Sequence, residues 1–166
     1  MVFDPFTRAL LEQHTTCTPL LPDDWYGPWT SILTTLFPPP QGYVVNPRKR
    51  HELEDGSLSD LIFDIFKVTF PLTFRTLLIV EIKGSHHWDH GIPAFMQEIG
   101  RQTVLAFLGN ATHKVYWIGT IGPHWIYGEK EDDDQAPRPL IGWHDVTHDD
   151  ASYRDLLQLV ELVDSL

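Results

Sequence analysis

The feature that most constrains the fold is an almost continuous apolar run that ends in charged residues. Residues 75–83 contain Leu77-Leu78-Ile79-Val80 and then finish with Glu81-Ile82-Lys83. A strand reads as continuously apolar when other layers of structure cover both of its faces. The run therefore predicts an interior strand of a sheet that lies between helices, with charged side chains at one end of that strand.

A second strand-like segment precedes this run and predicts a β-hairpin. Residues 60–70 alternate in polarity and are rich in β-branched and aromatic side chains, which is typical of a strand. Residues two apart on a strand point to the same side of the sheet, so Glu81 and Lys83 share a face. If the chain turns after residue 70, Asp60 and Asp64 lie roughly across from the end that carries Glu81.

The remaining pattern predicts one mixed sheet flanked by helices. Spacings of three and four predict helices, and β-branched runs predict strands. Helices are expected over residues 4–14, 24–37, 92–108 and 152–163, and further strands over residues 42–48, 114–120 and 125–128. Residues 140–143 are expected to form another short strand or an extended segment. Asp4 is expected to cap the first helix, and Asp23 or Asp24 the second. The order of elements predicts a single α/β domain over residues 1–166.

For two segments the pattern also predicts which residues are buried or exposed. The helix over residues 92–108 is expected to face the sheet with Phe95, Ile99, Val104, Leu105 and Leu108. The acidic stretch within residues 129–139 is expected to be an exposed loop, because charge runs are usually solvated.

Charge and composition narrow the classes of function. The chain has 166 residues, of which 42% are apolar, and a formal net charge of −11. Such a charge repels nucleic acid on average, so a nuclease would need a local basic patch or a bridging metal ion. Cys17 is the only cysteine, and no run predicts a membrane span or a secretory signal. These observations favour an intracellular protein, in cytoplasm or nucleus, without a membrane partner.

The charged end of the hairpin is a candidate metal site. Asp60 and Glu81 offer hard oxygen ligands for Mg²⁺ or Mn²⁺, and the backbone carbonyl of Ile82 can complete the shell. Lys83 can then orient an attacking water or stabilise charge on a phosphoryl group. Asp64 is the second choice for the first carboxylate. The alternative is a solvated ion pair, because Glu-x-Lys tripeptides are common by chance.

The run Ser59-Asp60, followed by Glu81-Ile82-Lys83 and a helix with Gln97, resembles the PD-(D/E)XK, or restriction-endonuclease-like, nuclease superfamily and its fungal members. The resemblance extends from residue 42 to the C-terminus. It implies a core in αβββαβ order, Mg²⁺-dependent hydrolysis of phosphodiester bonds and a supporting role for Gln97. Ser59 stands where the family usually has proline. Many members are dimers, so a homodimer is also open.

Basic residues near this site are candidates for contact with a nucleic-acid backbone. Arg48-Lys49-Arg50 is the only basic cluster, and Arg101 lies one helical turn after Gln97. The alternatives are a solvated loop for the cluster and a surface position for Arg101. Nothing in the pattern distinguishes DNA from RNA.

Two other functions compete with the nuclease. His86, His87 and His90 could bind zinc, or they could line the mouth of the same cleft. The acidic composition instead favours a module that keeps the fold and binds or regulates without catalysis.

Overall fold

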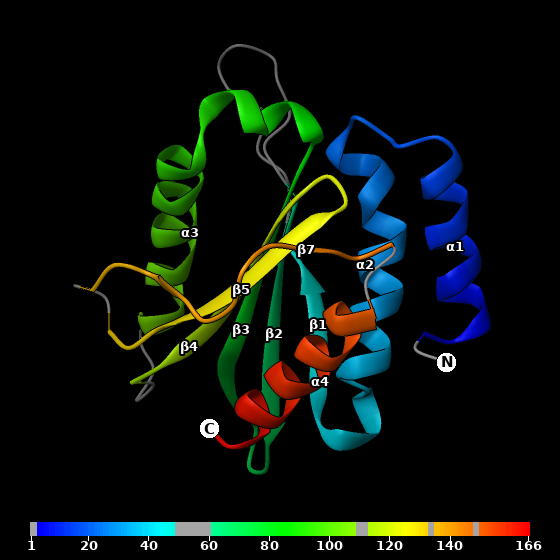
Figure 1. Ribbon diagram of the computed structural model, residues 1–166. Helices are drawn as coiled ribbons and strands as arrows, with labels where there is room; N and C mark the ends of the chain where they lie inside the picture. Colours follow the sequence, from blue (N-terminus) through cyan, green and yellow to red (C-terminus); the bar gives the residue numbers. More distant parts are fainter. Residues whose placement is uncertain (1–2, 49–60, 109–112, 133–134, 148–149) are drawn as a thin grey trace.

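The computed structural model describes residues 3–48, 61–108, 113–132, 135–147 and 150–166. A mixed sheet of seven strands forms the middle layer (Figure 1). Helix α3 covers one face, while α2 and α4 cover the other, with α1 packed beside α2. The predicted mixed α/β architecture is confirmed at this level. Among the described residues, no helix is long and apolar enough to span a membrane.

The four predicted helices are present with modest changes at their ends. Their bounds are α1 Pro5–Thr16, α2 Pro22–Leu36, α3 Ile92–Phe107 and α4 Asp150–Asp164, and short 3₁₀ turns occupy η1 Pro39–Gln41 and η2 Ser85–His90. The Asp4 side chain accepts hydrogen bonds from the backbone N–H groups of Phe6 and Thr7, as predicted. The predicted cap of α2 is wrong, because Asp23 and Asp24 already lie inside its first turn.

The strands follow chain order across the sheet. They are β1 Tyr43–Pro47, β2 Leu61–Thr69, β3 Thr73–Lys83, β4 Val115–Ile121, β5 His124–Lys130, β6 Arg138–Pro139 and β7 His144–Asp145. Strands β3 and β4 are parallel and the other pairs are antiparallel, so α3 is the crossover between β3 and β4. Residues 140–143, expected as a short strand or an extended segment, form no strand, and β6 and β7 on either side of them pair with β5.

The larger part of the core lies between the sheet and α2 with α4. Helix α2 contributes Trp25, Trp29, Ile32 and Leu33, each at most 1% exposed. They pack against alternate residues of β2 to β5, among them Val80 and Ile82 of β3. The face of β3 that carries Val80 and Ile82 therefore lies in this core. Because side chains alternate along a strand, Glu81 and Lys83 point to the other face, under α3.

The face of α3 differs from the expected one. The residues buried against the sheet are Phe95, Ile99, Thr103 and Ala106, whereas Leu105 is 50% and Leu108 is 65% exposed. Each helical residue is rotated by about 100° from the previous one, so residues 95, 99, 103 and 106 form one row and Leu105 falls outside it. The small side chains of Thr103 and Ala106, rather than the larger leucines, sit over the sheet.

Candidate functional site

Glu81 and Lys83 form a buried ion pair at the end of β3. Both side chains are 1% exposed, and Lys83 Nζ lies 2.9 Å from Glu81 Oε1. The predicted arrangement of these two residues on one face of a central strand is confirmed. The ion pair is not the solvated surface pair that was the alternative.

Helix α3 and β4 enclose this pair. Glu81 pairs with Gly119 of the parallel strand β4. A Cβ atom on Gly119 would lie 2.1 Å from Cζ of Phe95, so the phenyl ring fills the space above this glycine. Phe95 itself is fully buried. Any larger residue at position 119 would displace this ring, which lies over the strand partner of Glu81.

Burial makes this pair energetically costly as a purely structural feature. Removing two ions from water costs several kcal/mol for each ion, and this cost is roughly as large as the attraction between them. Two apolar side chains in the same place are therefore often as stable as the ion pair. Charged residues held in such an environment are candidates for function. Glu81 and Lys83 are therefore candidates for a chemical role besides their part in stability.

The first predicted metal ligand, Asp60, lies outside the described residues. It directly precedes Leu61, the first residue of β2, and Leu61 pairs with Ile82 between Glu81 and Lys83. The side chain of Ile82 lies in the core on the other face, so only its backbone carbonyl could serve as a ligand. Within the described parts of the chain, no group of three or more His, Cys, Asp or Glu side chains could hold a metal ion.

Asp64, the second choice, is bound to Arg48. Arg48 donates from Nε and Nη2 to the two carboxylate oxygens of Asp64, both at 2.6 Å. Asp64 pairs with Ile79, one strand repeat away from the position opposite Glu81. A bidentate pair of this kind is among the stronger ion pairs, so the structure assigns Asp64 to Arg48.

The glutamine that reaches the sheet is Gln102. Its Oε1 accepts a hydrogen bond of 2.8 Å from Nη1 of Arg48. Gln97, the predicted glutamine, is instead exposed on the outer side of α3. Gln102 lies seven residues after Phe95 and three after Ile99, and this spacing is the signal that could have identified it.

The predicted nucleic-acid contacts are distributed differently. Arg48 serves Asp64 and Gln102, and a pocket of about 230 Å³ opens beside it, lined also by Thr76, Leu105 and Ala106. Arg101 is 65% exposed and forms an ion pair with Glu98 on the same helix. Lys49 and Arg50 lie outside the described residues.

The three histidines form part of the 3₁₀ turn η2. Nδ1 of His87 and Nδ1 of His90 are 3.4 Å apart, and the rings of His86 and His90 are 6.4 Å apart between centroids. The expected zinc pair, His86 and His90, depended on an α-helix, in which positions i and i+4 share a face. The segment forms a 3₁₀ turn instead, and Gly84 separates it from Lys83.

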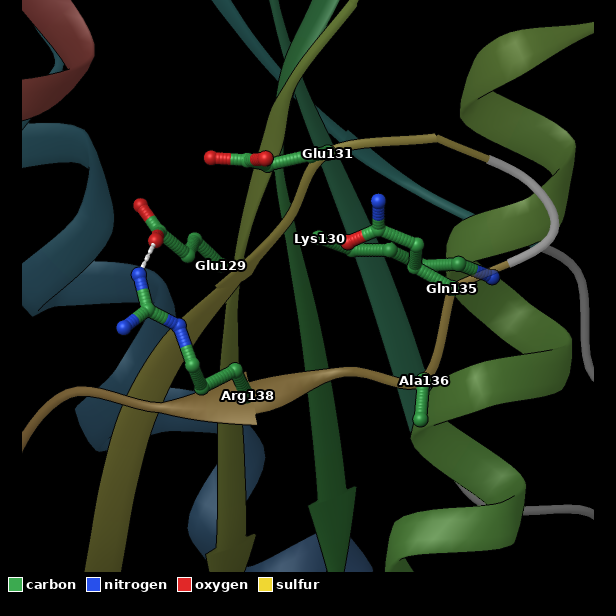
Figure 2. Close-up of a pocket in the computed structure, with 6 residues that line it drawn as sticks. All are labelled: Glu129, Lys130, Glu131, Gln135, Ala136 and Arg138. Carbon is green, nitrogen blue, oxygen red and sulfur yellow. Dashed lines mark hydrogen bonds and ion pairs between the residues drawn. The ribbon is translucent and has the colours of Figure 1, made fainter.

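A second buried glutamate, Glu129, lies toward the opposite end of the sheet. Its carboxylate accepts hydrogen bonds from Lys114 at 2.9 Å and from Arg138, and it borders a pocket of about 290 Å³ (Figure 2). Burial alone would raise the pKa of Glu129, but the hydrogen bonds from Lys114 and Arg138 outweigh it and lower that pKa. The prediction that residues 129–139 form an exposed loop is wrong at its start, because β5 extends to Lys130, and Glu129 and Lys130 are buried.

Comparison with known proteins leaves the site to be interpreted from its own chemistry. No protein-family model matches the chain, and no curated protein or solved structure shows significant similarity to it. A mixed α/β fold by itself is compatible with many functions.

Proposed function

We propose that this protein is a metal-dependent nuclease of the PD-(D/E)XK type, which hydrolyses phosphodiester bonds of nucleic acid. The observation that carries the proposal is the buried Glu81–Lys83 pair at the end of the central strand β3, with a separation of 2.9 Å. An acid and an amine on one face of a strand end match the carboxylate and lysine that such a reaction needs.

Glu81 and Asp60, with the carbonyl of Ile82, would hold Mg²⁺ or Mn²⁺. Such an ion, when bound, polarises the phosphodiester and lowers the pKa of a bound water. Lys83 donates to Glu81 Oε1 and thereby stands where it can also donate to a water or a phosphoryl oxygen. Glu81 and Lys83 are both 1% exposed, and burial of this kind strengthens electrostatic interactions.

A second candidate is a module that keeps the fold and binds nucleic acid or a protein without catalysis. The net charge of −11 favours it. So does the internal engagement of two basic residues, because Arg48 is held by Asp64 and Arg101 by Glu98. Binding to duplex nucleic acid normally relies on cations that are available to phosphates.

The deciding experiment measures Mn²⁺ binding by calorimetry and cleavage of labelled single-stranded and duplex DNA and RNA. We expect Glu81→Gln to lose Mn²⁺ binding and to reduce cleavage by a factor of about 100 or more. Asp60→Asn should behave in the same way. The matched control is Glu129→Gln, which removes another buried glutamate of the same sheet and should leave both signals intact.

Two results would contradict the nuclease. If the wild-type protein neither binds Mn²⁺ nor cleaves any substrate, the nuclease is excluded and the non-catalytic binding module remains as the proposed function. Cleavage that survives in Glu81→Gln would show that the reaction occurs at another site.

A further inference from the structure

A chain of aromatic rings, here called the aromatic rim, lies at the end of the sheet where β3 finishes. Its members are Trp88, His124, Trp143, Phe95, His87 and His90. Trp88 lies 4.9 Å from Trp143 and 5.7 Å from His124 between ring centroids. The rim comes from four separate segments of the chain, so it exists only in the folded protein.

The rim is attached to the strand end that carries the candidate site. Turn η2, which carries Trp88, follows Lys83 with only Gly84 between them. The β4–β5 turn, which directly precedes His124, is tied to the same point because Gly122 N–H donates to the carbonyl of Lys83 at 2.9 Å. Gly122 has a φ of 59°, and a Cβ there would lie 2.3 Å from Ser85 Oγ, so the two turns are in close contact.

Phe95 connects the rim to the buried ion pair. One part of its ring lies over Gly119, the partner of Glu81 in β4. The same ring lies 5.5 Å from Trp143 and 6.2 Å from His87 between centroids. A ligand stacked on Trp88 would therefore be linked through Trp143 to Phe95, the ring that lies over the strand partner of Glu81.

Trp88 is the exposed tryptophan of the rim, and His90 is exposed as well. Trp88 is 39% exposed, although Trp143 and His124 already contact it, whereas Phe95 is fully buried. A single exposed aromatic residue is ordinary. A tryptophan held by rings on two sides is different, because its own side chain loses little further conformational entropy when a ligand stacks on it.

The composition of the rim favours unpaired bases as its ligand. Indole and imidazole rings stack on nucleobases, with a contribution of about 1–3 kcal/mol for each base. In a duplex the bases are paired and phosphates face outward, and a chain of net charge −11 repels those phosphates. A single strand exposes its bases, so stacking can replace much of the missing phosphate contact.

We infer that the aromatic rim binds unpaired bases of single-stranded nucleic acid and presents the strand to Glu81 and Lys83. The second half of this inference, presentation for cleavage, rests on the proposed nuclease function. The first half, binding, does not, and it is measured without catalysis.

The test follows fluorescence anisotropy of a labelled oligothymidylate of about 16 nucleotides, in EDTA, against the full chain. We expect the single strand to bind more tightly than a duplex of the same length. Trp88→Ala should weaken binding by a factor of about 10, which corresponds to the loss of one stacked base. Trp88→Phe, which keeps an aromatic ring, should restore most of the affinity and also shows that the fold tolerates a change there.

The control is Phe70→Ala, since Phe70 is 93% exposed in the β2–β3 turn and lies outside the rim. Its affinity should equal that of the wild type. The inference is overturned if Trp88→Ala binds as well as wild type, if the duplex binds as tightly as the single strand, or if no oligonucleotide binds. The last result would leave a protein partner as the occupant of the rim.

The outcomes separate this inference from the nuclease. Tight, Trp88-dependent binding without cleavage under any divalent ion would remove the nuclease and keep the rim. Cleavage that is lost in Glu81→Gln but unchanged in Trp88→Ala, for single strands and duplexes alike, would keep the nuclease and remove the rim.

Discussion

Glu81 and Glu129 are two buried glutamates of one sheet, and each lies 2.9 Å from a lysine Nζ. Their partners differ. Lys83 is 1% exposed, so both ions of the first pair are removed from water. Lys114 is 30% and Arg138 is 68% exposed, so the cations around Glu129 remain hydrated. Burial of an acid is expected to cost less free energy when its cations stay in solvent, because fewer charges are then removed from water.

The two clusters also differ in what they connect. Lys114 precedes β4 and Arg138 belongs to β6, so Glu129 joins segments on both sides of β5. Figure 2 shows its ion pair with Arg138. This is a structural role that requires neither a substrate nor a metal. Glu81 and Lys83 belong to the same strand, so their ion pair joins no separate elements. The Glu129 cluster therefore has a structural role, whereas the proposed function rests on the Glu81 pair.

The largest effect is expected when Lys83 is replaced by Met. The change leaves the Glu81 carboxylate buried without its ammonium partner, and we expect a loss of about 3–5 kcal/mol in the free energy of unfolding. The double variant Glu81→Gln with Lys83→Met should lose much less than the two single variants together, because it removes both charges. Urea denaturation of the three variants measures this coupling.

The control for that cycle is Lys114→Met, after which Glu129 keeps Arg138 as a partner. It should cost less than Lys83→Met. Equal losses, or strictly additive effects of Glu81→Gln and Lys83→Met, would contradict the distinction between the two clusters.

An intermediate effect is expected for Glu129→Gln. The carboxylate accepts charge-assisted hydrogen bonds from Lys114 and Arg138, and its loss should cost about 1.5–3 kcal/mol. Because the pKa of Glu129 is lowered in the folded protein, this contribution is complete above the ordinary value of 4.5. It disappears as the pH falls through the folded pKa.

Unfolding of wild type and Glu129→Gln should therefore be compared from pH 7 down to about pH 3. The difference in unfolding free energy between the two proteins should shrink below pH 4.5. A difference that stays constant over this range would mean that the carboxylate charge is not what stabilises the cluster.

The smallest effect is expected for Arg138→Ala. The side chain of Arg138 is 68% exposed, and exposed ion pairs contribute about 0–1 kcal/mol. Thermal unfolding at low and high salt measures this loss, which should diminish as salt screens the pair. A loss in unfolding free energy as large as that of Glu129→Gln would mean that Arg138 alone accounts for the stability that the cluster contributes.

The hairpin and its charged end could be predicted from local pattern. Strand alternation comes from covalent geometry, so the spacing of Glu81 and Lys83 places them on one face wherever the strand packs. The apolar run Leu77-Leu78-Ile79-Val80 likewise indicated that both faces of β3 are covered. The helices were predictable for the same reason, because their periodicity is repeated over several turns.

The side chains that surround the site were less predictable. Gln97 and Gln102 are both on α3, and only the rotation of the helix decides which one reaches Arg48. That rotation depends on the fit of Phe95 over Gly119, a residue 24 positions later in the chain. Glu129 was expected in a loop because the acidic residues that follow it dominate the local composition, and its burial depends on strand pairing in β5.

The sequence by itself determined which segments form strands and helices. It also determined that an acid and an amine share one face at the end of β3. Only the tertiary structure decided that this pair is out of water, that Asp64 belongs to Arg48 and that separate turns bring Trp88, His124 and Trp143 together. The physical reason is range. Periodicity acts between neighbouring residues, whereas burial and ring packing depend on segments that meet only when the sheet has formed.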